Sequence, residues 1–258
     1  MYDSYLRYLQ NINLDNIKNL NFKNNPEYNN ILEHVSREQG EYYLNLIRQD
    51  FGDITFKQII DFSSINDKYG EPKKETYIYV NKEEVKSSPT SIRYIYHALL
   101  ILKHYKDNTS SEIVEVGCGY GGLFLAICFF SRILDIKIDK YYFIDLPPVC
   151  NLINSYLLIN KDHISINYEI HNSNDYVNKI SKNNLFFISN YCFTEIKDEC
   201  RNNYIEYLLP NVSCGFIIWQ TVFGFNIENA YKILKVKYIK EELPQTASKE
   251  NKNYFVYF

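Results

Sequence analysis

Two acidic residues stand near the ends of neighbouring apolar runs. The stretch "IVEVGCGYGG" (113–122) holds Glu115 just before a glycine-rich turn, and "YYFIDLPP" (141–148) holds Asp145. Glycines after a buried strand let the backbone approach a ligand closely, and Gly117, Gly119 and Gly122 satisfy the dinucleotide pattern G-x-G-x-x-G. A tight strand-to-helix turn without a ligand would use the same glycines. The two acids are therefore the residues that indicate whether a ligand binds and which one.

The positions of the two acids favour one kind of ligand. Glu115 lies two residues before the first glycine, where it would repel a bound pyrophosphate, and it suits a ligand that carries an ammonium and a sulfonium. S-adenosylmethionine carries both groups. Asp145 can accept hydrogen bonds from both ribose hydroxyls of an adenosyl group, or cap the helix that begins at Pro147, and the two functions are compatible. The sequence therefore predicts S-adenosylmethionine as the cofactor.

The elements that must position these acids alternate from Ser111 onward. Short apolar runs predict strands and the patterns between them predict helices. The expected strands are 111–117, 140–146, 164–171, 184–191 and 214–220, and the expected helices are 121–134, 147–160, 174–180, 194–209 and 226–235. Two further strands, 237–243 and 253–258, close the chain without a helix between them. This order predicts an α/β, Rossmann-like, doubly wound sheet that is mostly parallel with an antiparallel last strand.

The first hundred residues are polar, rich in Asn and mainly helical in pattern, as in 25–47 and 91–106. Turn signals and a short strand are expected at 67–80. We expect residues 1–108 to form a helical N-terminal extension that covers the acceptor or forms a homodimer. Residues 109–258 are expected to bind the cofactor.

The composition of the chain limits the kinds of binding partner to expect. The formal net charge is −3 and no basic stripe is present, so nucleic acid is not the expected partner. The N-terminus lacks the layout of a secretory signal, and no apolar run reaches the roughly 18 residues of a membrane span. The six cysteines form no CxxC pair and have no His at ligand spacing, so no metal is expected and buried thiols are favoured. We expect a cytoplasmic protein with no membrane partner.

The glycine turn "VEVGCGYGG" with "IDL" after the next strand resembles the class I S-adenosylmethionine-dependent methyltransferases, over Ser111 to Phe258. The resemblance implies a seven-stranded sheet of order 3-2-1-4-5-7-6. A narrower resemblance rests on "ILEHVS", "SPTSIRYIYHALLIL", "VGCGYGGL", "YYFIDLPPVCNL", "FISNYC" and "EELPQT", which together are similar to the sugar O-methyltransferase group. It implies methylation of a hydroxyl on a sugar or nucleotide-sugar.

The resemblance also implies roles for individual residues. Those around the methionine end of the cofactor are Glu115, Gly117, Gly119, Tyr120 and Gly121. Asp145 would bind the ribose and Leu146 would pack near the adenine. Asn174 or Asp175 would reach the adenine amino group, with a polar helix cap as the alternative. Ser189, which ends the fourth strand, would face the cofactor, and Asn190 and Tyr191 would face the acceptor.

Methylation of a hydroxyl acceptor requires a general base. A sugar hydroxyl is a poor nucleophile at neutral pH and needs a base within hydrogen-bond reach, or a metal. His34 is favoured on chemistry because imidazole accepts a proton at neutral pH, and Glu195 on topology because it follows the fourth strand. Glu195 would equally suit the first turn of a helix. Arg93 could meet the cofactor carboxylate or a substrate phosphate, or form a surface ion pair.

Three other functions compete with this interpretation. A methyltransferase for another small-molecule or protein acceptor would keep the same cofactor site, although "SNYC" is not the Asn/Asp-Pro-Pro-Tyr signature of the amino-group enzymes. An NAD-dependent oxidoreductase is disfavoured by Glu115 and by the final strand pair. A scaffold without activity is disfavoured by the intact glycine turn and both acids.

Overall fold

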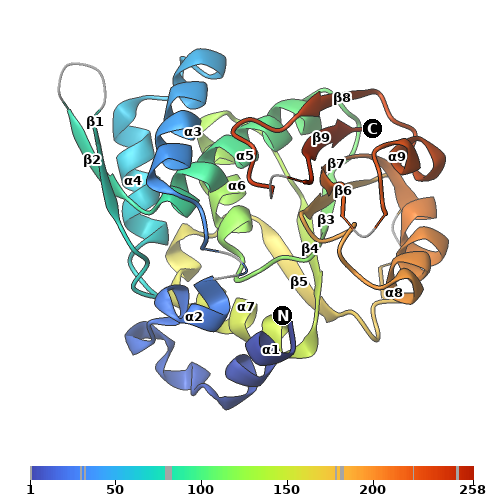
Figure 1. The fold of residues 1–258 in the computed structure, drawn as a ribbon, viewed down its shortest axis with the longest axis horizontal. Coiled ribbons are helices and arrows are strands. Elements are labelled where there is room, and N and C mark those ends of the chain that lie inside the picture. Colours follow the sequence, from blue (N-terminus) through green and yellow to red (C-terminus); the bar gives the residue numbers. More distant parts are fainter. Residues whose placement is uncertain are drawn as a thin grey trace. The chain divides into compact units, whose positions relative to one another are not determined.

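The computed structural model describes residues 2–29, 31, 33–78, 83–177, 179–180, 183–222, 224–247 and 250–258 (Figure 1). The chain forms two compact units. The first comprises Met1–Leu100, Gly119–Leu134 and Asn151–Ser165, and the second comprises Ile101–Cys118, Asp135–Cys150 and Ile166–Phe258. The division of function at residues 108 and 109 stays a prediction.

The described residues of the second unit form a seven-stranded sheet in the order β5-β4-β3-β6-β7-β9-β8 (Figure 1). Strand β9 is antiparallel to β7 and β8, and the pairs among β3 to β7 are parallel. The strands are β3 (Glu112–Val116), β4 (Lys140–Asp145), β5 (Asn167–Asn172), β6 (Leu185–Asn190), β7 (Val212–Gln220), β8 (Tyr238–Glu241) and β9 (Asn253–Tyr257). Numbered within the sheet, this is the expected order 3-2-1-4-5-7-6, and the predicted fold class is confirmed.

One face of this sheet packs a continuous apolar core. Val114, Phe187, Trp219 and Val256 are fully buried members of that cluster, each from a different strand. Because side chains alternate along a strand, Glu115 and the residues that neighbour it across the strands lie on the opposite face. The apolar runs of the sequence therefore fix which face each polar strand residue occupies.

Two predicted helices of the second unit differ in the structure. Residues 174–177 and 179–180 form turns instead of a helix, and Asn178 lies outside the described residues. The helix expected from residue 194 begins only at Asp198, as α8 (Asp198–Asn203), and continues through a π-helical turn (Tyr204–Leu208) and a 3-10 turn (Leu209–Asn211). The delay has a local cause, because the amides of Glu195 and Ile196 both bond Cys192 O and close a turn directly after β6. Helix α9 (Glu228–Ile233) lies within its predicted range.

The first unit is mainly helical, as predicted. Its helices are α1 (Tyr2–Asn11), α2 (Pro26–Asn29), α3 (Arg37–Asp50), α4 (Phe56–Asn66), the first part of α5 (Pro89–Lys106), α6 (Gly122–Ile133) and most of α7 (Pro147–Ile159), and β1 (Glu75–Ile78) pairs with β2 (Glu84–Ser87). The helical pattern at 25–47 is interrupted between α2 and α3. Ser36 and Gln39 form a capping box that starts α3 afresh, which explains the interruption.

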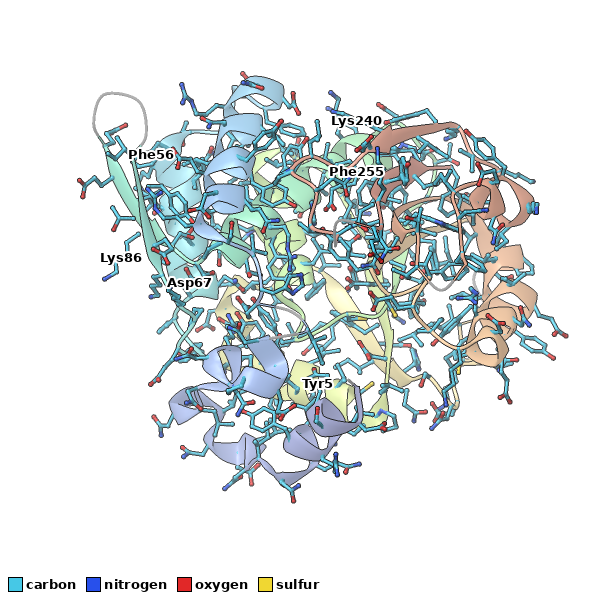
Figure 2. The ribbon with its side chains drawn as sticks, in the orientation of Figure 1. Tyr5, Phe56, Asp67, Lys86, Lys240 and Phe255 are labelled. Atoms are coloured by element: carbon cyan, nitrogen blue, oxygen red, sulfur yellow. The ribbon has the colours of Figure 1, made fainter. Side chains whose placement is uncertain are left out.

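A buried polar cluster holds the first unit together at the end of α4, around Asp67, which is labelled in Figure 2. The Asp67 carboxylate accepts three hydrogen bonds, from Ser88 N at 2.6 Å, Ser88 Oγ at 2.7 Å and Ser91 Oγ at 2.6 Å. Asn66 donates to Ser91 Oγ and accepts from the hydroxyl of Tyr156. The motif "SPTS" thus has a structural explanation: its serines solvate a buried acid and tie α4 to the start of α5.

Candidate cofactor and acceptor site

Glu115 is a buried acid, and within the described residues no ion pair involves it. It is 2% exposed, and Tyr141 donates a hydrogen bond to its Oε2 at 2.8 Å. Burial raises the pKa of Glu115, and so does the charge of nearby Asp145, whereas the Tyr141 and Cys118 hydrogen bonds lower it. The net pKa is about 8. Without a ligand the carboxyl is therefore mostly protonated at neutral pH. An ammonium group beside it would favour the ionised form.

Asp145 ends β4, the neighbour of β3. Its Oδ2 accepts from Cys118 N at 2.6 Å and its Oδ1 from Leu146 N at 2.8 Å, so the carboxylate orients the start of the glycine turn. A carboxylate oxygen can accept more than one hydrogen bond, which suits the pair of ribose hydroxyls. The cap of α7 is not Asp145, since Leu146 O accepts the first bonds of that helix, from Val149 and Cys150. The prediction that Asp145 caps α7 is therefore wrong, and the cap is the next residue, Leu146.

The glycine turn needs its glycines for backbone geometry. Gly117, Gly119 and Gly121 have φ of 80°, 57° and 90°, values that residues with a Cβ adopt with difficulty. Gly121 is the N-cap of α6. At Gly117 a Cβ would also lie 2.2 Å from Cys192 Cβ, so the turn after β6 demands a glycine there whether or not a ligand binds.

The residues predicted near the adenine are exposed. Leu146 is 37% exposed directly after Asp145, which leaves an apolar surface beside the acid. Asn174 and Asp175 lie in an exposed turn, where Asp175 pairs with Lys179 at 2.5 Å. Their alternative role as a helix cap is wrong, because the described residues after them form turns. A contact with the adenine stays a prediction.

The end of β6 carries three predicted residues with different surroundings. Ser189 is fully buried, donates to Val116 O at 2.8 Å and accepts from Phe193 N, so it fixes β6 to β3. Among the described residues, neither Oδ1 nor Nδ2 of Asn190 has a hydrogen-bond partner, although both atoms are buried. Tyr191 adopts φ of 62° and donates its hydroxyl to Glu242. Asn190 is therefore the residue of the three with open hydrogen-bonding capacity.

Glu195 lies half-buried in the turn after β6, three residues before α8 begins. The expectation that it occupies the first turn of a helix is wrong. Its backbone amide bonds Cys192 O at 2.9 Å, which holds it near the carboxyl end of β6 in the same unit as Asn190.

Tyr120 and Arg93, like Gly119 and Gly121, were assigned to the cofactor and belong to the first unit. Tyr120 is fully buried, hydrogen-bonds Asn66, and lies against Lys23, whose Nζ is 4.2 Å from the ring centroid. Its side chain anchors the glycine turn to the polar cluster of this unit. Arg93 is 3% exposed, so the alternative of a surface ion pair is wrong.

His34 also lies in the first unit, in the segment between α2 and α3. More than a third of its surface is exposed, yet nearby protein atoms and then the Arg93 charge lower its pKa to about 4. The imidazole is neutral at physiological pH and a weaker base than the sequence alone indicates. Neighbouring Glu33, which sequence reasoning missed, has its pKa raised to about 7 by burial.

Two further residues missed by sequence reasoning end strands of the second unit. Among the described residues, buried Gln220 Oε1 at the end of β7 and buried Asn253 Oδ1 at the start of β9 have no hydrogen-bond partner. The two residues are direct neighbours across the strands. A polar residue that closes each apolar run, as in "FIIWQ", was the available signal.

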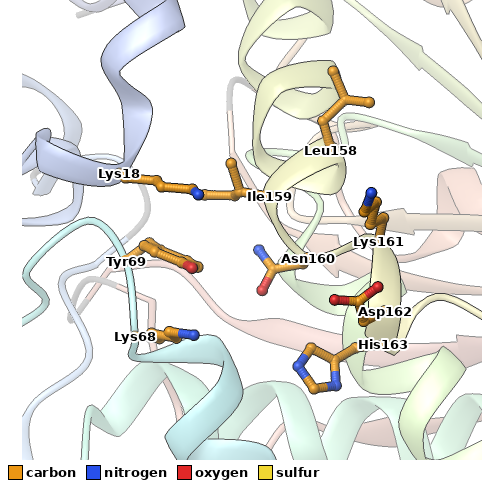
Figure 3. Close-up of a pocket in the computed structure, with 9 residues that line it drawn as sticks. All are labelled: Lys18, Lys68, Tyr69, Leu158, Ile159, Asn160, Lys161, Asp162 and His163. Atoms are coloured by element: carbon orange, nitrogen blue, oxygen red, sulfur yellow. The ribbon is translucent and has the colours of Figure 1, made fainter.

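A cavity of about 410 Å³ lies elsewhere, within the first unit (Figure 3). Lys18, Lys68 and Tyr69 point toward the segment from Leu158 to His163, which forms the opposite wall (Figure 3). In the described part of the chain, no predicted site residue lines this cavity. It is thus distinct from the acids and amides that end the strands of the sheet.

Two searches of the described residues found nothing. They contain no group of three or more His, Cys, Asp or Glu side chains placed to hold a metal ion. Within the same residues, no helix combines the length and apolar character needed to cross a bilayer.

No family model and no curated protein sequence matches this chain. Among solved structures, it is similar to M. capricolum TrmK in complex with S-adenosylhomocysteine (13% identity, 64% of this chain and 66% of that chain, TM-score 0.41). It is also similar to an O-methyltransferase family protein from Burkholderia thailandensis (8%, 65% and 56%, 0.44) and to an rRNA methylase from Streptococcus thermophilus (12%, 64% and 90%, 0.41). The chain spans a little under two thirds of TrmK. The proposals below rest on the site residues and the sheet order.

Proposed function

We propose that this protein is an S-adenosylmethionine-dependent methyltransferase that methylates a hydroxyl of a sugar or nucleotide-sugar. One observation carries the choice of cofactor: two carboxyl groups, Glu115 and Asp145, stand at neighbouring strand ends beside the glycine turn, and the pKa of Glu115 is raised to about 8. A cation beside Glu115 would favour its ionised form, which a pyrophosphate cannot do. This argues against the NAD-dependent oxidoreductase.

The residues present fit the cofactor. Glu115 would hold the ammonium group, Asp145 the ribose hydroxyls, and Leu146 would cover one side of the adenine. When bound, S-adenosylmethionine supplies an electrophilic methyl group on a sulfonium. The protein then has to align the acceptor oxygen with that methyl group and remove its proton.

Of the two predicted bases, we assign Glu195 ahead of His34. Glu195 lies in the turn directly after β6, the strand that Asn190 ends. The pKa of about 4 removes the advantage in basicity that imidazole has over a carboxylate, so position decides. Asn190 would orient the acceptor. The net charge of −3 favours a small acceptor over nucleic acid.

The cofactor is tested by calorimetry with S-adenosylhomocysteine and with NAD. We expect S-adenosylhomocysteine to bind and NAD not to bind, and Asp145→Ala to weaken binding by about 1–3 kcal/mol through lost hydrogen bonds to ribose. Asp139→Ala is the matched control, because Asp139 is an exposed acid of the same unit paired with Lys137, and affinity should not change. Tight NAD binding without heat from S-adenosylhomocysteine would overturn the proposal.

The base is tested by single-turnover transfer of a labelled methyl group to a panel of sugars and nucleotide-sugars. Glu195→Gln should slow transfer by about 10²–10⁴ while the affinity for S-adenosylhomocysteine stays unchanged. Glu199→Gln, an exposed acid on α8, serves as control. A near-native rate for Glu195→Gln would remove Glu195 from the mechanism.

A further inference from the structure

Three amide side chains stand in register at one end of the sheet in the second unit. Asn190 of β6 neighbours Ile218 of β7, two residues before Gln220, and Gln220 neighbours Asn253 of β9. Laterally paired residues of a sheet share a face, and so do residues two apart along a strand. Asn190, Gln220 and Asn253 therefore lie on one face, which we name the amide row.

The same register places Glu115 on this face. Glu115 of β3 neighbours Ile188 of β6, and Ile188 lies two residues before Asn190. The amide row thus continues, strand by strand, from the acid assigned to the cofactor. Ile188 and Ile218 on the same face are fully buried and apolar, so the polar side chains of this face gather at one end of the strands.

The amide row contains buried polar atoms whose hydrogen-bonding capacity is open. Among the described residues, Asn190 Oδ1 and Nδ2, Gln220 Oε1 and Asn253 Oδ1 have no partner. Folded proteins pair nearly all buried polar atoms, because an unpaired one loses its hydrogen bonds to water without replacement. Four such atoms on one face point to a ligand that supplies the missing partners.

The orientation of Asn253 is fixed by a second network. Its Nδ2 donates to Glu242 Oε2 and to Thr246 Oγ1, each at 2.9 Å, and Glu242 also accepts from the Tyr191 hydroxyl. An ionised carboxylate only accepts hydrogen bonds, so the amide nitrogen must face Glu242 and Oδ1 must face away. Asn253 is 1% exposed, and its free oxygen is thus a preset acceptor.

We propose that the amide row binds neighbouring hydroxyls of a neutral sugar ring, which makes it the acceptor site of the proposed methyltransferase. The oxygens of Gln220 and Asn253 accept from hydroxyls, and the Asn190 amide both donates and accepts. No ionised side chain belongs to the row, so it selects hydroxyls over phosphates and ammonium groups. Gln220 and Asn253 are paired on strands ~4.8 Å apart, so two hydroxyls of one ring can reach both oxygens. The proposal rests on the proposed function for its methyl donor only.

The test measures sugar binding separately from cofactor binding. Saturation-transfer NMR with a panel of monosaccharides is recorded for the full chain, with and without S-adenosylhomocysteine. Gln220→Met keeps the side-chain length and removes the amide, and we expect it to weaken sugar binding about fivefold to tenfold. Asn190→Leu provides a second variant, and Asn202→Met, an exposed amide of α8, is the control with unchanged binding.

The outcomes separate the two proposals. Binding of S-adenosylhomocysteine with no sugar binding, or with sugar binding unchanged in folded Gln220→Met and Asn190→Leu, would overturn the amide row and leave the cofactor assignment intact. Sugar binding that weakens in both variants while S-adenosylhomocysteine fails to bind would support the row and overturn the proposed function.

Discussion

Asp67 of the first unit and Glu115 of the second unit are both buried acids, but their hydrogen-bond partners and nearby charges differ. Asp67 in the first unit accepts three hydrogen bonds from Ser88 and Ser91. Glu115 in the second unit is similarly buried, and burial, followed by the charge of nearby Asp145, raises its pKa to about 8 although the Tyr141 hydroxyl donates to it. A buried carboxylate with its full set of donors stabilises a fold, whereas one left without them is held ready for a ligand.

The same contrast applies to the amides. Asn66 of the first unit bonds Ser91, Tyr120 and Tyr156, and its carbonyl accepts from Lys23 Nζ at 2.5 Å. The amide row of the second unit has open capacity at each of its three residues. Asn66 and the amide row thus differ in how much of their hydrogen-bonding capacity the described residues use.

The largest effect is expected from breaking the satisfied acid. Asp67→Ala should lower the free energy of unfolding by about 3–5 kcal/mol, because the donors of Ser88 and Ser91 are left buried without an acceptor. Chemical denaturation measures it. The control is Asp61→Ala on α4, an exposed acid paired with Lys57, which should cost less than about 1 kcal/mol. Equal effects of the two variants would contradict the contrast between the units.

The unsatisfied acid should show itself in the pH dependence of stability. The folded pKa of Glu115 is above its unfolded value of about 4.5, so the folded state keeps a proton that the unfolded state loses. The stability that the protein has with Glu115 protonated is therefore present at low pH and is lost as pH rises toward about 8.

Glu115→Gln should therefore gain about 2–4 kcal/mol relative to the native protein between pH 5 and pH 8, because Gln does not ionise. Urea unfolding at several pH values measures the difference. Glu112→Gln, an acid of the same strand, gives the comparison curve. Parallel curves for native protein and Glu115→Gln would show that the carboxyl is ionised in the fold.

A cationic ligand should expel the Glu115 proton. We expect the affinity for S-adenosylhomocysteine to rise up to about tenfold from pH 6.5 to pH 7.5, with nearly one proton released per ligand at pH 7. Calorimetry in two buffers of different ionisation enthalpy counts the protons. Glu115→Gln should bind more weakly and release none. Proton release that persists in this variant would assign it to another group.

The smallest change in stability is expected in the amide row. Gln220→Met should lower the free energy of unfolding by less than about 1 kcal/mol, or raise it, because it removes a buried oxygen that has no partner among the described residues. Thermal and urea unfolding check this. A loss similar to that of Asp67→Ala would mean that Gln220 is a structural residue and that the row is not a site.

The sequence allowed prediction of the sheet because its signals are local. Alternation of short apolar runs with helical patterns indicated the strands of the second unit, and the terminal strand pair indicated the reversed β9. Glu115 and Asp145 could be placed at strand ends for the same reason. Helix limits were less predictable: the turn closed by Cys192 O delays α8, and the polar stretch at 174–180 forms turns despite its helical pattern.

Only the tertiary structure decided what surrounds those residues. Cys192 leaves no room for a side chain at position 117, and the serines of "SPTS" donate to Asp67. Glu242 sets the orientation of the Asn253 amide. In each case the two residues are separated in the sequence. The pKa of Glu115 and of His34 depends on burial and on charges brought near by folding. The amide row exists only through strand register, which joins residues 190, 220 and 253 on one face. Local pattern determined which residues end the strands, and long-range contact determined which of them keep open hydrogen-bonding capacity.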